Sequence, residues 1–425
     1  MSPTPRLAAL LAGAALTFLF LPPPLAVLLI LALLAGGAGD ALAVRRPPRL
    51  DRTFPGILAR GVPADLRIDV DADGATTRVR QPVPPDLDLR PREADGPLQA
   101  TLVPRRRGRH PVPPPAVWVE GRFGLGRVHH EGGKAADVLV YPDMPAAHRL
   151  VAAVRQGRFR DPGVLTRGPL GLGTDFESIR EYLPDDDIRQ VNWRASARTG
   201  RPMSNQYRVE QDRSVICCID SGRLMAAPVS ATPGSAAGAG VPLTRLDAAL
   251  DAAVAVALVA DEIGDQAGAI AFDSTVRRRV PPRRRGGTAV VHTLFDLEPT
   301  SADSDYELAF RQVGTRKRSL VIVFTDVLEE GAARTLVEAV PVLARRHHVV
   351  VASARDPDFD RMLRTPPAAV REVLAASVVV EALDARAKVA AQLTRAGAEV
   401  LEAPPDSLAA ACVGAYLRAK ARSRL

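Results

Sequence analysis

The feature that most constrains the fold is the alternation of short apolar runs with longer helical patterns after residue 213. The run Ser214–Asp220, SVICCID, is continuously apolar and ends in an acid, which is typical of a parallel strand buried on both faces. Similar runs follow at AGAIAFD, SLVIVFTD, HHVVVAS and AEVLEA, with TVRRRVPP as a further strand. Strands that alternate with helices predict a doubly wound α/β domain with a mostly parallel sheet over residues 214–425.

Helices are expected between these strands. Leu243–Ile263 contains TRLD, which resembles a capping box with Asp in place of Glu, and it is apolar on nearly every side. Charges interrupt it, so a buried helix that covers the sheet fits better than a membrane span. Further helices are expected near residues 288–297, 332–345, 385–396 and 407–421.

Two apolar runs, Leu7–Leu21 and Leu25–Gly39, open the chain, with three prolines between them. Neither run alone reaches the roughly 20 residues that a spanning helix prefers, but the second extends to about Val44 if Asp40 lies near the membrane interface. Together they predict a short transmembrane hairpin within residues 1–49.

Charges at the ends of this hairpin predict its orientation. Arg6 precedes the first run and Arg45, Arg46 and Arg49 follow the second, so the positive-inside rule places both ends, and the bulk of the chain, on the cytoplasmic side of the inner membrane. The three cysteines form no disulfide framework, which agrees with this compartment. The alternative is a cleaved signal peptide with the small residues Ala41-Leu42-Ala43 at its cleavage site.

Residues 50–165 are rich in Pro and Arg and contain short β-type segments such as LRIDV, LQATLVP, AVWVEG and ADVLVYP. Their alternation of apolar and polar residues predicts a small antiparallel sandwich. Two basic segments here, PRRRGRHPVPPP and RFGLGRVHH, fit either a patch for anionic lipid or solvated loops and an edge strand guarded by Arg and Pro. The formal charge of +8 comes with few aromatic residues, so nucleic acid is not an expected partner.

Two of the predicted strands end in aspartates, Asp220 and Asp326, at the edge where open α/β sheets bind ligands. Here the domain resembles the von Willebrand factor A fold, whose adhesion site holds a metal. The resemblance implies that Asp220, Thr288 and Asp326 would bind Mg²⁺. Gly222 and Leu224 replace two serine ligands of that motif, which weakens the site because Mg²⁺ demands six oxygen ligands. The alternative is a pair of acids hydrogen-bonded to backbone amides of the following loops.

Residues 166–213 form a connector that contains GTDFESIREYLPDDDIRQVNWRASARTGRPM, Gly173–Met203. Acids and arginines alternate in it, which favours an internal ion-pair network, and Trp193 and Tyr182 are expected to pack their apolar faces. No Ser/His/Asp order, phosphate-binding loop or HExxH motif occurs in the chain. The candidate interaction or structural residues of the connector are Asp175, Arg180, Tyr182, Asp186, Asp187, Arg189, Asn192, Trp193, Ser196 and Arg198.

This run resembles the signature of the domain of unknown function 58 family, with Asp185 where that family usually has Gly. Members commonly occur beside MoxR-type AAA+ ATPases, so the resemblance implies a membrane-anchored, non-enzymatic adaptor or assembly factor that works with such an ATPase. Two alternatives remain open. One is a metal-dependent hydrolase that uses the Asp185–Asp187 cluster, and the other is an outward-facing envelope-binding protein.

Overall fold

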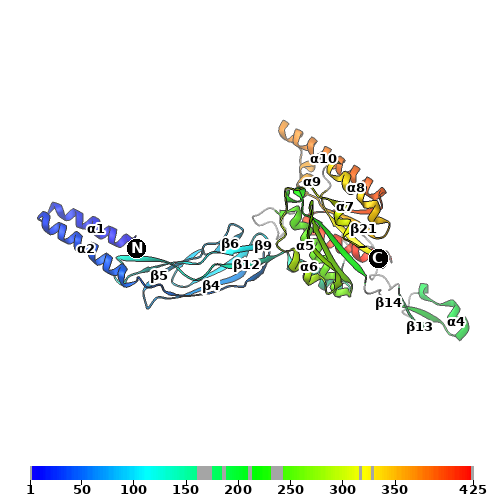
Figure 1. Cartoon of the computed structure of the whole chain (residues 1–425), viewed down its shortest axis with the longest axis horizontal. Coiled ribbons are helices and arrows are strands. Elements are labelled where there is room, and N and C mark those ends of the chain that lie inside the picture. Colours follow the sequence, from blue (N-terminus) through cyan, green and yellow to red (C-terminus); the bar gives the residue numbers. More distant parts are fainter. Residues whose placement is uncertain are drawn as a thin grey trace. The chain divides into compact units, whose positions relative to one another are not determined.

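The structure is a computed structural model that describes residues 2–159, 175–183, 188–208, 213–230, 243–314, 318–326 and 330–422. It is mixed α/β, and the chain forms two compact units, Met1–Tyr141 and Pro142–Leu425 (Figure 1). The first unit ends earlier than the boundary at residue 165 expected from the sequence. The difference arises because helix α3 (Met144–Arg155) packs on helix α5 (Arg245–Ile263) of the second unit.

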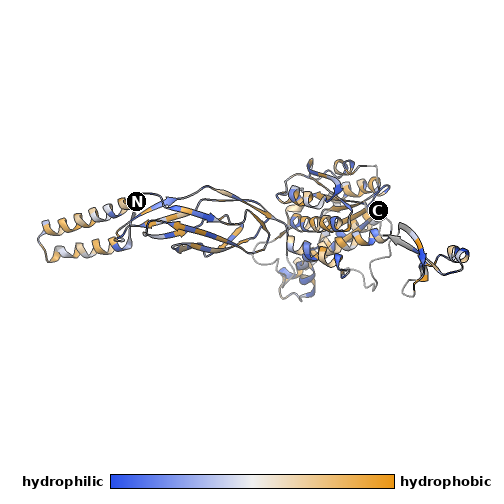
Figure 2. Ribbon diagram, turned by 90° about the horizontal axis from the view of Figure 1, so that it is seen from below, coloured by the Kyte–Doolittle hydropathy of each residue, from blue (hydrophilic) through white to orange (hydrophobic). Residues whose placement is uncertain are grey.

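The first unit begins with two helices that lie side by side, α1 (Pro5–Leu16) and α2 (Pro23–Ala43), joined through a short 3-10 helix, Thr17–Leu19. Prolines occupy the first turn of each helix, where a missing N–H costs little. Apart from Arg6 and Asp40 near their bases, both helices are largely apolar (Figure 2), and α2 is long and apolar enough to cross a membrane. The predicted helical hairpin is therefore present, with α2 ending at Ala43.

From Arg49 to Tyr141 every regular element is a strand. Their inward residues, among them Leu66, Ile68, Leu102 and Val117, form one core. The strands form three sheets: β1 (Ser2–Pro3), β11 (Gly126–Glu131), β10 (Ala116–Glu120), β5 (Thr76–Arg80) and β7 (Glu93–Asp95); β2 (Arg49–Thr53), β4 (Ala64–Asp71), β8 (Leu98–Pro104) and β6 (Leu87–Arg90); β3 (Ile57–Ala59), β12 (Ala136–Tyr141) and β9 (Gly108–Val112).

A six-stranded sheet forms the centre of the second unit. Its spatial order is β19 (Val276–Arg284), β18 (Gln266–Phe272), β15 (Ser214–Asp220), β20 (Ser319–Phe324), β21 (His348–Ala354) and β22 (Ala398–Ala403). All neighbouring pairs are parallel except that of the edge strand β19. The strand order reverses between β15 and β20, and such a switch point is where α/β sheets open a crevice at their carboxyl ends.

Helices cover both faces of this sheet. Cys218 lies in the core beneath α7 (Tyr306–Arg311), α8 (Glu330–Ala344) and α10 (Val370–Arg395), whereas the neighbouring Cys217 Sγ lies 3.9 Å from the Ala253 carbonyl of α5 on the other face. The capping box predicted at the start of α5 is present, because Thr244 and Asp247 each bond the other's backbone N–H. The remaining elements of this unit outside the connector are the 3-10 helix Arg223–Ala226, α6 (Gly287–Leu294), α9 (Pro357–Arg364), α11 (Pro405–Ala421) and the short pair β16 (Pro228–Val229) and β17 (Leu243–Thr244).

Candidate functional site

Asp220 and Asp326 lie at the carboxyl edge of the central sheet, as the sequence predicts. Asp220 ends β15 and Asp326 follows β20, and these strands are hydrogen-bonded neighbours. Both carboxylates are buried. A buried charge is costly unless other groups pair with it, so the partners of the two acids decide what this edge can do.

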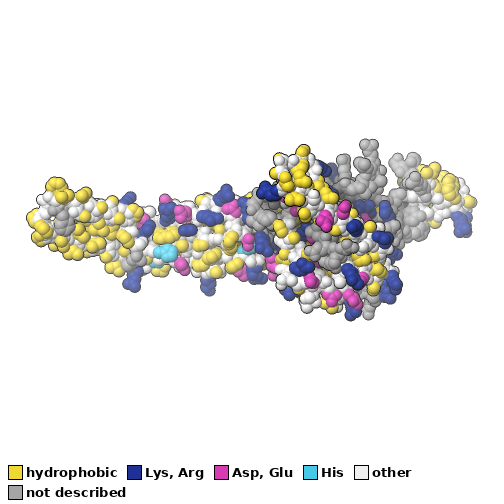
Figure 3. Space-filling view, turned by 90° about the horizontal axis from the view of Figure 1, so that it is seen from above, with side chains coloured by type: hydrophobic (Ala, Val, Ile, Leu, Met, Phe, Trp, Pro, Cys, Tyr) yellow, Lys and Arg dark blue, Asp and Glu magenta, His cyan; other side chains and the backbone are white. Residues whose placement is uncertain are grey.

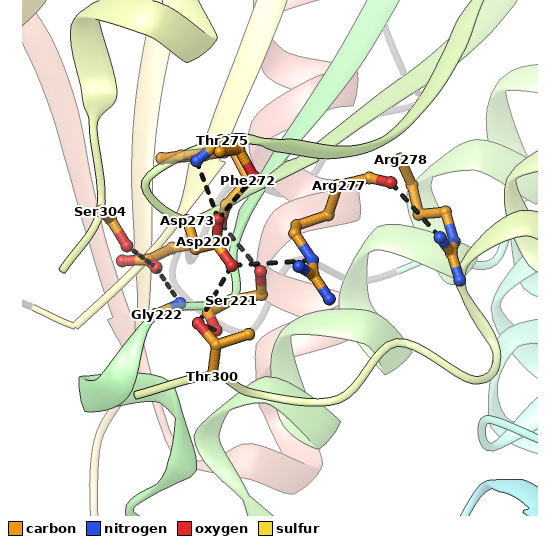
Figure 4. Close-up of polar contacts among 10 residues, drawn as sticks. All are labelled: Asp220, Ser221, Gly222, Phe272, Asp273, Thr275, Arg277, Arg278, Thr300 and Ser304. Carbon is orange, nitrogen blue, oxygen red and sulfur yellow. Dashed lines mark hydrogen bonds and ion pairs between the residues drawn. The ribbon is translucent and has the colours of Figure 1, made fainter. Parts of the chain in front are cut away.

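Asp220 is held by four donors. It accepts hydrogen bonds from Gly222 N at 2.8 Å, Ser304 Oγ at 2.5 Å, Tyr306 OH at 3.0 Å and Thr325 Oγ1 at 2.6 Å (Figure 4 shows the first two). Burial and the adjacent carboxylate raise the pKa of Tyr306 well above its usual value, so the phenol is a neutral donor. The carboxylate is therefore surrounded by fixed donors.

A second acid of this edge, Asp273, follows β18 and is satisfied in the same way. Thr275 donates to it from its backbone N at 2.8 Å and its Oγ1 at 3.1 Å, Thr300 Oγ1 donates at 3.1 Å, and Arg277 Nε lies 3.6 Å away (Figure 4). Burial by itself would raise the pKa of Asp273, but these hydrogen bonds and the guanidinium outweigh it and lower the pKa. Asp273 thus stays ionised and tied to the loops around it.

Asp326 pairs with two arginines from distant helices. Arg245 Nη1, at the start of α5, lies 2.5 Å from Asp326 Oδ1, and Arg386 Nη2 of α10 lies 3.6 Å from the same oxygen. Arg386 also donates to Ser353 Oγ at 2.7 Å and lies 3.4 Å from Glu402. Burial lowers the pKa of Arg245 and the charge of Asp326 opposes that shift. A guanidinium therefore supplies the positive charge that a metal would supply at this strand end.

The expected metal site is not assembled. The N-terminus of α6, which carries Thr288, packs near Ala267 at the start of β18, whereas Asp220 pairs with Phe272 at the end of that strand, about 16 Å further along. Within the described residues, no three His, Cys, Asp or Glu side chains form a group able to hold a metal ion. The alternative of backbone-bonded acids is confirmed for Asp220 at Gly222, and hydroxyl groups and guanidinium groups, which leave no signal in the sequence, supply the other partners of the two acids.

The connector forms a β-hairpin with a short helix at its tip. Strands β13 (Asp175–Glu181) and β14 (Met203–Arg208) pair antiparallel, and between them lie the 3-10 turn Ile188–Gln190 and α4 (Trp193–Thr199). Asn192 caps α4 by accepting from Ala195 N at 2.9 Å, and it donates to Asn205 Oδ1 at 2.8 Å. Ser196 Oγ accepts from Met203 N at 2.8 Å, which ties α4 to β14. Two of the signature residues thus hold the hairpin together.

Several large apolar side chains of the hairpin are exposed. Trp193 is 73% exposed and Ile188 69% exposed, and Leu183 and Arg198 are also on the surface. The expectation that Trp193 packs its apolar face is wrong, because the single short helix that carries it offers no second layer. Tyr182 is half-buried. Among the described side chains of the hairpin, Arg201 Nη1 lies 3.9 Å from Glu181 Oε1, which is one long contact of the expected ion-pair type.

Of the remaining signature residues, most have side chains outside the described part of the structure. Arg180 Nη1 donates to the Glu181 carbonyl at 3.0 Å. Asp186 and Asp187, with Asp185, lie outside the described residues, as do the side chains of Asp175 and Arg189. The expectation of an acid cluster at 185–187 therefore stays a prediction.

The fold and the connector define a class of protein: a mixed α/β chain with an N-terminal apolar hairpin and a signature hairpin before its parallel sheet. A family model described as "Protein of unknown function DUF58" matches residues 178–380, from the connector into α10. Uncharacterized proteins from Mycobacterium bovis and Mycobacterium tuberculosis are each 25% identical over 205 residues, which cover 46% of this chain and 60% of each relative.

Solved structures resemble this chain only weakly. An uncharacterized membrane spanning protein from Vibrio fischeri aligns with a TM-score of 0.19 at 14% identity, covering 45% of this chain and 91% of that chain. The PilB minor pilin from Streptococcus sanguinis aligns with a TM-score of 0.35 at 7% identity, covering 89% of this chain and 79% of that one. Both TM-scores lie below 0.5.

Proposed function

We propose that this protein is a non-enzymatic assembly factor of the domain of unknown function 58 family, anchored in the inner membrane with its bulk in the cytoplasm. Its α/β domain is of the von Willebrand factor A type, and its partner is a MoxR-type AAA+ ATPase. The observation that carries the proposal is the connector hairpin, which exposes Trp193 and Ile188 on a frame fixed by side-chain hydrogen bonds. Exposed aromatic residues on a rigid frame are characteristic of the centres of protein interfaces.

The chemistry of the sheet edge supports a role in binding over one in catalysis. Asp220 accepts hydrogen bonds from four donors, and Asp326 lies in ion-pair contact with Arg245 and Arg386, so groups of this chain already face both carboxylates, which disfavours either as a base or metal ligand. The thiols are also inert, because burial raises the pKa of Cys217 to about 12 and Cys218 and Cys412 are equally buried. In the described part of the chain, these buried acids and thiols therefore serve the stability of the domain.

The N-terminal hairpin supports membrane attachment. α2 meets the length and hydropathy of a membrane-crossing helix, and large apolar side chains cover the surface of both helices (Figure 3). Soluble proteins rarely expose an apolar surface of this extent. The arginines at its base favour the cytoplasmic orientation.

The proposal is tested by purifying the protein from gently solubilised membranes and identifying what accompanies it. Trp193→Ala is expected to lose an AAA+ ATPase that wild type retains, because the variant removes the largest exposed contact while keeping the Asn192 and Ser196 bonds. Val342→Ala is the matched control, since Val342 is 72% exposed on α8, outside the hairpin. Equal recovery of the ATPase with wild type and both variants would show that Trp193 of the hairpin is not part of the interface. Recovery of envelope proteins alone would support the outward-facing alternative.

A further inference from the structure

The apolar hairpin is clamped to the β-rich part of the first unit at the turn between β10 and β11. Asp40 of α2 is buried, and it accepts hydrogen bonds from three backbone N–H groups of the turn: Phe123 at 3.1 Å, Leu125 at 2.8 Å and Gly126 at 3.1 Å. Charge-assisted bonds to three donors within four residues of the chain fix the orientation of the turn on the helix. The last third of α2 therefore packs against the β-rich part of the same unit.

Contacts at the start of α1 reinforce the clamp. Thr4 donates its Oγ1 to the Gly124 carbonyl at 2.6 Å and its N–H to Leu125 O at 3.2 Å. A Cβ on Gly126 would lie 2.3 Å from the Gly37 carbonyl, so the helix and the turn approach as closely as glycine allows. Both helices are thus held at their bases by the same turn.

The clamp limits how far the hairpin can reach. Before its contacts with the turn, α2 extends from Pro23 to Ala35, a length of about 20 Å at 1.5 Å per residue. From Pro5 to Leu19 the first arm measures about 24 Å. The hydrocarbon core of a bilayer is about 30 Å thick. The tip carries no charge and Phe20 there is 87% exposed, so it suits the hydrocarbon interior better than an aqueous far side.

The turn itself has the composition of a membrane-interface segment. Phe123 at its outer edge is 72% exposed, and Arg122 beside it is also exposed. The guanidinium of Arg6 lies over Gly124, where a Cβ would be 2.8 Å from Nη1. An exposed aromatic ring on a turn that also carries Arg122 and contacts Arg6 matches the headgroup layer, where aromatic side chains concentrate and cations meet lipid phosphates.

We propose that the hairpin is a re-entrant anchor: its tip ends inside the bilayer, and Phe123, Arg6 and Arg122 lie among anionic lipid headgroups on the side of entry. This inference rests on the proposed membrane attachment, but it replaces a full crossing by insertion from one side. The Asp40 clamp then holds the β-rich part at a fixed height above the lipid.

Cysteine labelling tests the depth of the tip. The three native cysteines are buried, so wild type serves as the background. Phe20→Cys reports on the tip, and Asp95→Cys, whose side chain is 81% exposed, marks the side of the β-rich part. The full chain is reconstituted in sealed phosphatidylethanolamine–phosphatidylglycerol vesicles and treated with a membrane-impermeant maleimide outside, or both outside and trapped inside.

Asp95→Cys is expected to label from one side and Phe20→Cys from neither until detergent is added. Labelling of Phe20→Cys from the side opposite to Asp95→Cys would show a full crossing and overturn the re-entrant anchor alone. Labelling of both from the same side in intact vesicles would show that the hairpin does not insert, which overturns the membrane attachment as well.

A second measurement places the turn. Phe123→Trp in vesicles with lipids brominated near the headgroup is expected to show stronger quenching than with lipids brominated near the chain ends, after subtraction of the wild-type signal of Trp118 and Trp193. Quenching equal to that of wild type in both lipids would remove Phe123 from the membrane interface.

Discussion

Replacing Asp326 by Asn tests the reading of the sheet edge most directly. The Asp326 and Arg245 side chains are 2% and 5% exposed, and their charged atoms lie 2.5 Å apart. Asn keeps the shape of the side chain but removes its charge, which leaves a buried guanidinium uncompensated. Breaking one partner of a buried ion pair typically costs about 3–5 kcal/mol.

The geometry indicates where in this range the variant falls. Arg386 keeps Glu402 at 3.4 Å, so most of the loss falls on Arg245, and we expect about 3 kcal/mol. For a unit of this size each kcal/mol lowers the unfolding midpoint by about 2–4 °C, which gives a decrease of roughly 6–12 °C. If the strand end were instead an open metal site, loss of the acid would relieve repulsion in the metal-free protein, and the unfolding midpoint would not decrease.

The assay is thermal unfolding of the full chain in detergent, followed by circular dichroism, with hydrogen exchange of β15 and β20 as a local measure. Asp303→Asn is the matched control, because Asp303 pairs with Arg223 at 2.5 Å on the surface and such pairs contribute about 1 kcal/mol or less. An Asp326→Asn midpoint within the range of this control would refute the buried-pair reading. An increase in the unfolding midpoint of wild type on addition of Mg²⁺ would support the predicted metal site instead.

Three further variants test other contacts. Tyr306→Phe removes one donor to Asp220 and should destabilise the unit by about 1–2 kcal/mol in the same assay; an unchanged midpoint would show that the phenol is not a partner of the acid. Asn192→Ala removes the cap of α4 and should cost about 1 kcal/mol locally, seen as faster hydrogen exchange of residues 193–199 with an unchanged global midpoint; equal exchange would contradict the cap. Burial lowers the pKa of His347, so its contribution to stability is present above about pH 6.5 and is lost as the pH falls through its folded pKa. His347→Gln should therefore lose less stability than wild type between pH 7.5 and 5.5, and parallel pH dependence would exclude this linkage.

The sequence predicted those elements whose burial leaves a periodic pattern. The central strands and α5 with its capping box are where the apolar runs placed them, because a two-face-buried strand and an all-round-buried helix must be apolar along their length. It missed α3, α4, α7 and α9, none of which exceeds 12 residues. It also missed the first half of α10, where Val370, Val373 and Leu374 are exposed and no buried face imposes a period. The sequence identified the signature positions as a group. Only the structure shows that Asn192 is a helix cap whereas the adjacent Trp193 is an exposed side chain.

By itself, the sequence determined that Asp220 and Asp326 come to one sheet edge, since carboxyl ends of parallel strands meet there. Only the tertiary structure decided what those acids do. Their partners, Tyr306, Arg245 and Arg386, come from helices far along the chain and carry no local signal. In the same way the sequence showed an apolar hairpin, whereas its reach depends on Asp40 meeting a turn more than eighty residues away. Local pattern fixes what must be buried, and only packing between distant segments fixes what each buried charge contacts.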